Sequence, residues 1–508
     1  MRSARLHRLA SQLAAPLPWL TRLPGETILL SFGALVVGCL GLALYQQDER
    51  FLLPALALPA VALLLLADVR PVLLLLVGVL PFSKNVELPG GLSLDLLSEP
   101  LMLLLLALVL LRALRGHLAT DDATRWLRHP IAYLLLAQLA WAAWTTLFSI
   151  DLLHSFKYLL AKLWYLASFV VAVGLLVRRP ADVRLLVWAF LPSLLITIGY
   201  TTVRHIGEGL RFGAVNWAIQ PFYLNHVIYA IVVAQFLPYA LAGARLTGRG
   251  RAGWGRAGWW AAVGLILLGI VLAYTRATWL AVVAAGGYAL LLRLGWLRPA
   301  LVAAAVAAVV GSAWLVDQQH YLRFKPDYEH TVWHGHDLGK HLAATTDLSD
   351  ASEMERVYRW IAAARMIAQR PWMGTGPSTF YPEYQKYTDK RFRTYVSDNP
   401  EKSTTHNYFL LQLVEQGIPG LLLFAAVVWW ALVLPQDLYH RTRDPLLRTI
   451  VLVVGSSLTI IIFHLLLNEV VEVDKIGSFY FIGLTLLMKV DAWSREAAGA
   501  EYIPDQSG

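Results

Sequence analysis

Long apolar runs recur along almost the whole sequence, and each is long enough to cross or nearly cross a lipid bilayer. Charged residues make up only 15% of the 508 residues, too few to cover a water-soluble fold of this size. The sequence therefore predicts an all-α polytopic membrane protein of about 12–14 transmembrane helices. The fourteen runs fall near residues 27–45, 51–67, 71–82, 94–111, 130–148, 158–177, 185–203, 224–243, 257–275, 277–292, 299–316, 418–434, 449–467 and 476–490.

The distribution of basic residues predicts how these helices are oriented. If the N-terminus is cytoplasmic and every run crosses, the inside segments hold 23 Lys and Arg and the short outside segments hold 7. Cytoplasmic loops carry such an excess, so both termini are predicted to be cytoplasmic. The same arginines explain the net charge of +9 without a nucleic-acid partner. The single cysteine, Cys39, excludes an intramolecular disulfide.

One long polar segment, residues 317–405, is predicted to lie outside. Its 12 basic and 12 acidic residues balance, and a structureless loop of this length is unusual, so it is expected to fold as a lid or small domain. Residues 349–372 are expected to form a helix that Pro371 ends. We divide the chain into transmembrane helices 1–11 (1–316), a mainly helical outer loop domain (317–417), and C-terminal transmembrane helices with a cytoplasmic tail (418–508).

Several arginines are predicted at the outer face. Arg356, Arg359 and Arg370 fall within roughly 60° of one another on the predicted helix. Arg211 lies in a linker between two runs, and Arg276 lies at the outer end of a tight hairpin. Arginine at the interface is costly unless it is paired, so these side chains predict a receptor for the phosphate oxygens of a lipid diphosphate. The alternative is anchoring among the lipid headgroups.

The stretch 404-TTHNYFLLQLVEQGIPG-420 begins with a titratable group and then breaks. Thr404 or Thr405 is expected to cap a short helix, which would place His406 in its first turn. The helix dipole would lower the pKa of His406 there and favour the neutral imidazole that accepts a proton. Asn407 is the candidate for an orienting hydrogen bond. Gly417 is expected to end the short helix before the membrane span begins. The alternative is an interfacial histidine bound by water.

A metal site is not predicted. The segment 330-HTVWHGHDLGKH-341 offers His334, His336 and His341 to a zinc ion, but without helical spacing or a recognisable metal motif. The acidic run 347–355 is explained by its place at the start of the predicted helix. Lys162, His464 and Glu469 lie in or near apolar runs, and we interpret them as interior hydrogen-bonding residues.

Taken together, these motifs resemble the O-antigen ligase and polymerase superfamily, which includes the WaaL-type ligases. The resemblance covers roughly residues 190–435. It rests on the order of an arginine linker (Arg211), an outer hairpin TRATWLA, and a long outer loop. That loop contains R-x3-W (Arg356 and Trp360) and RPWMGTG, and is followed by THNYFLLQLVEQGIPG. The chain departs from the expected pattern in 221-PFYLN-225, which lacks a proline–asparagine pair, and in having more than twelve runs.

The resemblance implies a multi-span C-type glycosyltransferase of the bacterial inner membrane. Such an enzyme takes a glycan from undecaprenyl diphosphate at the periplasmic face and moves it to an acceptor hydroxyl, without a metal or another cofactor. His406 would be the general base, with Asn407 beside it. Arg211 and Arg276 would bind the diphosphate, and Arg356 and Arg359 are further candidates.

The acceptor separates the remaining alternatives. A ligase would use lipid A–core and so complete lipopolysaccharide, and this is the reading we favour. A polymerase would use a second lipid-linked glycan. A protein O-oligosaccharyltransferase would use serine or threonine. A flippase for the lipid-linked glycan is the alternative that is not an enzyme.

Overall fold

The computed structural model describes residues 69–87, 93–114, 122–247, 254–316, 351–388 and 404–500. Within these residues, nine helices are long and apolar enough to cross a membrane. This confirms the predicted all-α polytopic fold. The first two predicted spans, the histidine-rich segment 330–341 and the acidic run 347–355 lie outside the residues whose side chains are described.

Helices dominate because lipid offers no hydrogen-bonding partner to the backbone, so a spanning segment must satisfy its own peptide groups. A short antiparallel hairpin of β1 (Asn85–Glu87) and β2 (Ser93–Asp95) is the one pair of strands in the described residues. The helices are α4 (Val69–Val79), α5 (Ser98–Leu114), α6 (Pro130–Leu147), α7 (Leu152–Tyr165), α8 (Val173–Leu176), α9 (Val183–Gly207), α10 (Val215–Ala218), α11 (His226–Leu246), α12 (Trp254–Leu272), α13 (Arg276–Leu294), α14 (Leu297–Val316), α16 (Ala351–Gln369), α17 (Phe380–Glu383), α18 (Tyr408–Arg441), α19 (Pro445–Leu465) and α20 (Asp474–Ala500).

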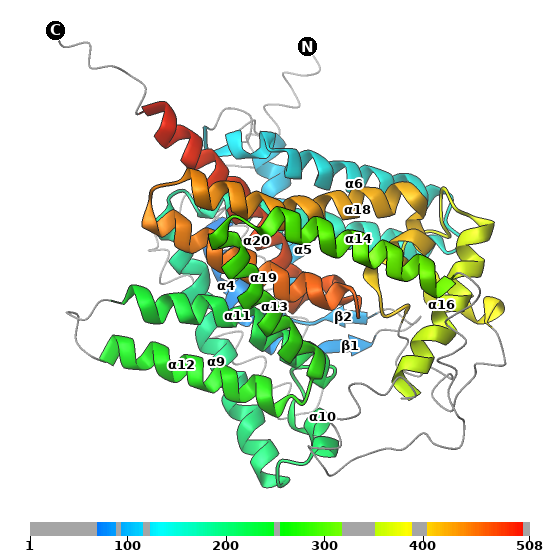
Figure 1. The fold of residues 1–508 in the computed structure, drawn as a ribbon, viewed down its shortest axis with the longest axis horizontal. Helices are drawn as coiled ribbons and strands as arrows, with labels where there is room; N and C mark the ends of the chain where they lie inside the picture. Colours follow the sequence, from blue (N-terminus) through cyan, green and yellow to red (C-terminus); the bar gives the residue numbers. More distant parts are fainter. Residues whose placement is uncertain are drawn as a thin grey trace, which may run out of the picture.

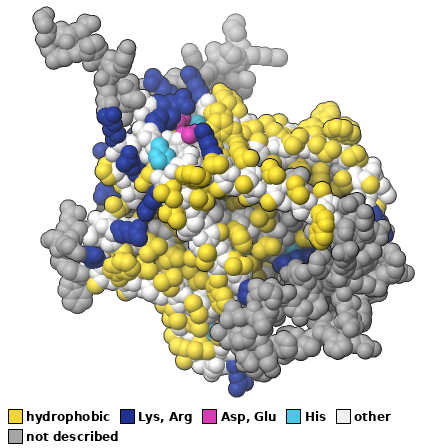
Figure 2. Space-filling view, in the orientation of Figure 1, with side chains coloured by type: hydrophobic (Ala, Val, Ile, Leu, Met, Phe, Trp, Pro, Cys, Tyr) yellow, Lys and Arg dark blue, Asp and Glu magenta, His cyan; other side chains and the backbone are white. Residues whose placement is uncertain are grey.

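Several residues that were predicted to share one side of the membrane meet in the structure. Near the C-terminal end of α20, the Asp491 carboxylate accepts a hydrogen bond from Arg441 at the end of α18 and lies 3.7 Å from His129, which precedes α6. Arg298 at the start of α14 pairs with Asp437 of α18. These residues belong to segments that were predicted to share the cytoplasmic side. Figure 2 shows Lys and Arg gathered near the end of α20, at the upper left.

The most enclosed long helix among those described is α20. In its most apolar 18-residue stretch, 89% of the residues are buried inside the protein, whereas the value for α13 is 28%. Helices α11 and α19 pack against α20 and complete the centre of the bundle. Figure 1 shows α16 at the opposite end from the C-terminus, beside the start of α18. The start of α18 therefore lies beside α16, while α18 also packs against α19 and α20.

Helix α18 contains the break that the sequence predicts at Gly417, where φ is 68° and ψ is −171°. The break is filled by backbone from the segment 371–376. Thr375 N donates to Val414 O at 3.0 Å, and Gly376 N donates to Glu415 O at 2.9 Å. Ile418 N, just after the break, donates to Pro371 O at 2.9 Å. The interruption thus docks this segment onto the start of the span while the peptide groups stay satisfied.

We predict that Gly417→Ala destabilises the protein by roughly 2 kcal/mol or more, because this combination of φ and ψ is essentially restricted to glycine and a Cβ would clash. That Cβ would lie 2.2 Å from Trp372 O. The measurement is thermal unfolding of the purified protein in detergent. Gly264→Ala is the matched control, since a Cβ there meets nothing within 4 Å. Equal unfolding temperatures for the two variants would contradict the assignment.

Candidate functional site

His406 lies two residues before Tyr408, the first residue of α18, rather than in the first turn of the helix. Its φ is 52°. The helix is capped by Asn407, whose side chain accepts a hydrogen bond from Leu410 N at 3.0 Å. The predictions that Thr404 or Thr405 caps the helix and that His406 sits within it are therefore wrong. Asparagine is as good a cap as threonine or better, and its Oδ1 reaches the third helical N–H. The Asn407 oxygen is engaged by the helix instead of orienting His406.

The imidazole of His406 contacts Asn468 instead. Nδ1 lies 3.4 Å from Asn468 Oδ1, in the connection between α19 and α20. This contact favours the tautomer with its proton on Nδ1, which leaves the lone pair on Nε2. Burial lowers the pKa of His406, and the guanidinium groups of Arg359 and Arg356 lower it too, against the opposing effect of Glu469. The neutral form is therefore favoured, as predicted, but chiefly through desolvation and not through the helix dipole.

Helix α16 fixes the backbone just before His406. Arg359 is only 3% exposed, and its Nη1 donates to Thr404 O at 3.1 Å. Trp360 Nε1 donates to Thr405 O at 2.8 Å. Arg356, one turn earlier, is half-buried, whereas Arg370 at the end of the helix is exposed. Of the three arginines predicted to lie close together on this helix, Arg356 and Arg359 are thus close enough to His406 to lower its pKa.

The connection between α19 and α20 joins the site from the other side. Glu469 Oε1 accepts a hydrogen bond from Thr404 N at 3.2 Å. The neighbouring Asn468 N donates to His464 O at 2.7 Å. His464 Nε2 in turn lies 3.0 Å from Thr278 Oγ1, two residues after Arg276. From the sequence we interpreted Glu469 as an interior residue and did not identify Asn468 as a candidate. The available signal was a polar Asn–Glu pair at the end of a long apolar run.

Two corners of the fold contact each other: the turn after α9, which carries Arg211, and the turn before α13, which leads into Arg276. Tyr274 Oη donates to Leu210 O at 2.7 Å, which ties the turn before α13 to the residue before Arg211. His205 Nε2 lies 2.9 Å from Arg211 O and supports the same corner. The Arg211 side chain is exposed, and Arg276 is the first residue of α13. The structure therefore groups these two corners, and α13 links them to the site through Thr278 and His464.

Backbone strain marks the same region. Among the described residues, the non-glycine residues with positive φ are Leu210, Tyr274, Ser378 and His406. Three of them are themselves, or lie within two residues of, a predicted site residue, and Ser378 N donates to the buried Glu415 carboxylate at 2.8 Å. Such conformations cost about 1–3 kcal/mol each and cluster at functional sites. Their positions give the site a second, independent indication.

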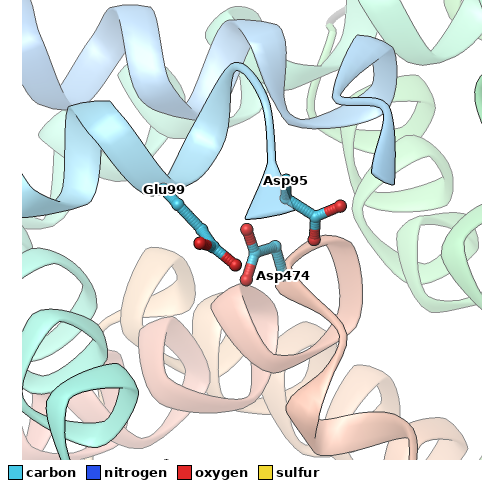
Figure 3. A group of neighbouring side chains, drawn as sticks. All are labelled: Asp95, Glu99 and Asp474. Carbon is cyan, nitrogen blue, oxygen red and sulfur yellow. The ribbon is translucent and has the colours of Figure 1, made fainter. Parts of the chain in front are cut away.

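A second polar group lies at the start of α20. Carboxylate oxygens of Asp95, Glu99 and Asp474 lie within 4.8 Å of one another, from β2, α5 and α20 (Figure 3). Oxygen ligands of this kind suit Mg²⁺ or Ca²⁺. Ser98 Oγ and Tyr165 Oη, however, both donate to Asp474. Because Asp474 already has protein donors, we assign the group a structural role: it joins the hairpin and α5 to the central helix.

Fold and site together define a multi-pass membrane protein with a histidine and several arginines at one end of its helical bundle. Residues 261–425 match the model of the O-antigen ligase family (Wzy_C). The match confirms the resemblance seen in the sequence, and it includes Arg276, Arg356, Arg359, His406 and Asn407. Arg211, Asn468 and Glu469 lie outside the matched segment. No curated protein matches the chain.

We predict that His406→Ala lowers turnover by about 10²–10⁴-fold, the usual contribution of a positioned general base. Folding should persist, because the capping bond belongs to Asn407. The measurement is glycan transfer by the reconstituted protein, with thermal unfolding as the check on structure. His154→Ala is the control, since this half-exposed histidine pairs with Asp151 at 2.7 Å and not with the site. Near-normal turnover without His406 would remove it from the mechanism.

Proposed function

We propose that the protein is a glycosyltransferase that moves a glycan from undecaprenyl diphosphate to an acceptor hydroxyl at the periplasmic face of the inner membrane. The match to the O-antigen ligase family supports glycan transfer of the ligase or polymerase type. The single observation that carries the proposal is the half-buried, neutral-favouring imidazole of His406, held beside two arginines of α16.

The imidazole can act on the acceptor. With its proton on Nδ1 facing Asn468, His406 offers Nε2 to the acceptor hydroxyl. As the hydroxyl oxygen bonds to the anomeric carbon of the glycan, its proton passes to Nε2. The bond between the anomeric carbon and the diphosphate oxygen breaks, and its electron pair leaves with the lipid diphosphate. A base with a pKa below its usual value is uncharged at neutral pH and ready for this step.

The leaving group needs positive charge. Arg211 and Arg276, on their joined corners, are the proposed diphosphate ligands, and Arg356 is a further one. A guanidinium can donate two parallel hydrogen bonds to phosphate oxygens, which suits a group that gains charge as the bond breaks. Arg359 donates to Thr404 O through Nη1 and so also helps to hold the backbone before His406.

We propose lipid A–core as the acceptor, which makes the protein an O-antigen ligase of lipopolysaccharide synthesis. The experiment is deletion of the gene followed by gel analysis of the surface glycan. Loss of long chains from lipid A–core, with free polymer accumulating, is the expected result. A single repeat unit left on the core would instead identify a polymerase. An unchanged surface glycan with fewer glycosylated proteins would identify a protein O-oligosaccharyltransferase.

We predict that Arg211→Lys and Arg276→Lys each lower transfer by about tenfold or more. Lysine keeps the charge but loses the planar fork, and a hydrogen bond to a charged group contributes about 1.5–3 kcal/mol. The measurement is donor turnover in proteoliposomes. Arg204→Lys is the control, because Arg204 stacks on Trp217 at 3.8 Å, in the same outer region. Normal donor use by both variants would make these arginines interfacial anchors.

We predict that transfer persists in excess EDTA, because arginines that neutralise the leaving diphosphate make a divalent cation redundant. The measurement is activity of the purified enzyme with the chelator, followed by separate addition of zinc, magnesium and manganese. Activity that is lost and then restored by one ion would contradict the prediction. In that case His334, His336 and His341, or the group around Asp474, would become the candidate ligands.

A further inference from the structure

We propose that Glu469 is the carboxylate partner of His406, a positioning residue that lets the imidazole accept the proton of the acceptor hydroxyl. The inference rests on the proposed function of His406 and extends it to a residue outside the family match, which ends at residue 425. It also replaces the interpretation of Glu469 as an interior hydrogen-bonding residue.

The position of Glu469 beside the backbone that precedes His406 supports the proposal. Glu469 reaches across from the α19–α20 connection, and its Oε1 accepts a hydrogen bond from the backbone N–H of Thr404, two residues before His406. The adjacent residue, Asn468, contacts the imidazole itself. Two consecutive side chains therefore contact His406 and the backbone just before it. Any shift of this connection would move the ring and its partners together.

The environment of the other oxygen of the Glu469 carboxylate also supports the proposal. Glu469 Oε2 is buried and has no hydrogen-bond partner among the described residues. A buried carboxylate oxygen without a donor is costly, by about 1–3 kcal/mol or more. A negative charge held in this state beside a base is best explained by the positive charge that appears when the base is protonated.

The charged groups around the His406 imidazole support the proposal as well. Three charged groups act on His406: Arg359 and Arg356 from α16, and Glu469 from the α19–α20 connection. Both arginines oppose protonation of the imidazole, and Glu469 alone among the three favours it. Without the carboxylate, only the two arginines of these three groups would remain, and both oppose formation of the imidazolium. Glu469 thus keeps His406 a useful base in the presence of the two arginines.

Glu472 shows that this role is specific to Glu469. It lies three residues further on, and its carboxylate pairs with Lys162 Nζ at 2.8 Å and accepts a hydrogen bond from Tyr408 Oη. Its charge is therefore neutralised within the bundle. Glu472→Gln removes a nearby carboxylate without removing the proposed partner, which makes it the matched control.

The experiment compares Glu469→Gln, Glu469→Asp and Glu472→Gln in the full-length protein. Glutamine retains an oxygen that can accept from Thr404 N–H and removes only the charge. One readout is transfer activity against pH. The other is the pH dependence of His406 modification by diethyl pyrocarbonate, measured by mass spectrometry, which requires neutral imidazole but no substrate.

We expect Glu469→Gln to shift the midpoint of His406 modification, and the acidic limb of the activity profile, to lower pH. The sign follows because the lost negative charge had stabilised the imidazolium. Maximal turnover should fall by about tenfold or more, a share of what a general base contributes. Glu469→Asp should partly restore the modification midpoint and the turnover. Glu472→Gln should leave the modification midpoint in place.

An unchanged midpoint in Glu469→Gln, with or without lost activity, would overturn the inference and leave Glu469 a structural residue. A midpoint that moves to higher pH would overturn it as well. Failure of the proposed function gives a different result: His406→Ala would retain transfer, whatever the modification profile of Glu469→Gln. The two ideas can therefore fail separately.

Discussion

Lipid offers no partner to a peptide group, and the architecture of this protein follows from that constraint. Within the described spans, the marked departure from helical φ and ψ in α18 occurs at Gly417, where backbone from another segment supplies the missing partners. The docking of residues 371–376 onto the break holds the segment that follows α16 against the start of α18. Glu415 strengthens the same joint by accepting hydrogen bonds from Ser378 N and Phe380 N. The candidate site is built beside this joint.

Charge in the bundle is paired at both ends, but differently. At the predicted cytoplasmic end, Asp491 accepts a hydrogen bond from Arg441 and lies 2.9 Å from Arg495, so this carboxylate faces two guanidinium groups. At the other end, Lys162 and Glu472 form a partly buried pair that also engages Tyr408, two residues after His406. This pair fixes the first turn of α18 against α7. Around His406, two arginines and the Glu469 carboxylate act on the pKa of the imidazole in opposite directions.

Local pattern was enough for most of the fold. The predicted spans in the described region reappear as helices, because lipid-length apolar runs have one way to satisfy their backbone. Most bounds shift by a few residues, whereas α18 and α20 extend well beyond the predicted runs 418–434 and 476–490. The break at Gly417 was also predictable, since glycine and proline punctuate an otherwise apolar run. Prediction failed for the details around His406. A threonine pair and an asparagine compete for the same cap, and sequence alone did not show which oxygen would reach Leu410 N.

The sequence by itself determined a helical membrane protein, the alternation of its helix ends, its family resemblance, and the histidine and arginines from which a site could be built. These depend on composition, on the length of apolar runs, and on short motifs, which are properties of neighbouring residues. Only the tertiary structure decided that Asn468 contacts His406, that Glu469 contacts the backbone of Thr404, and that Asp95, Glu99 and Asp474 come together. Those contacts join residues that are far apart in the chain. Their distances depend on how whole helices pack, and no local pattern records that packing.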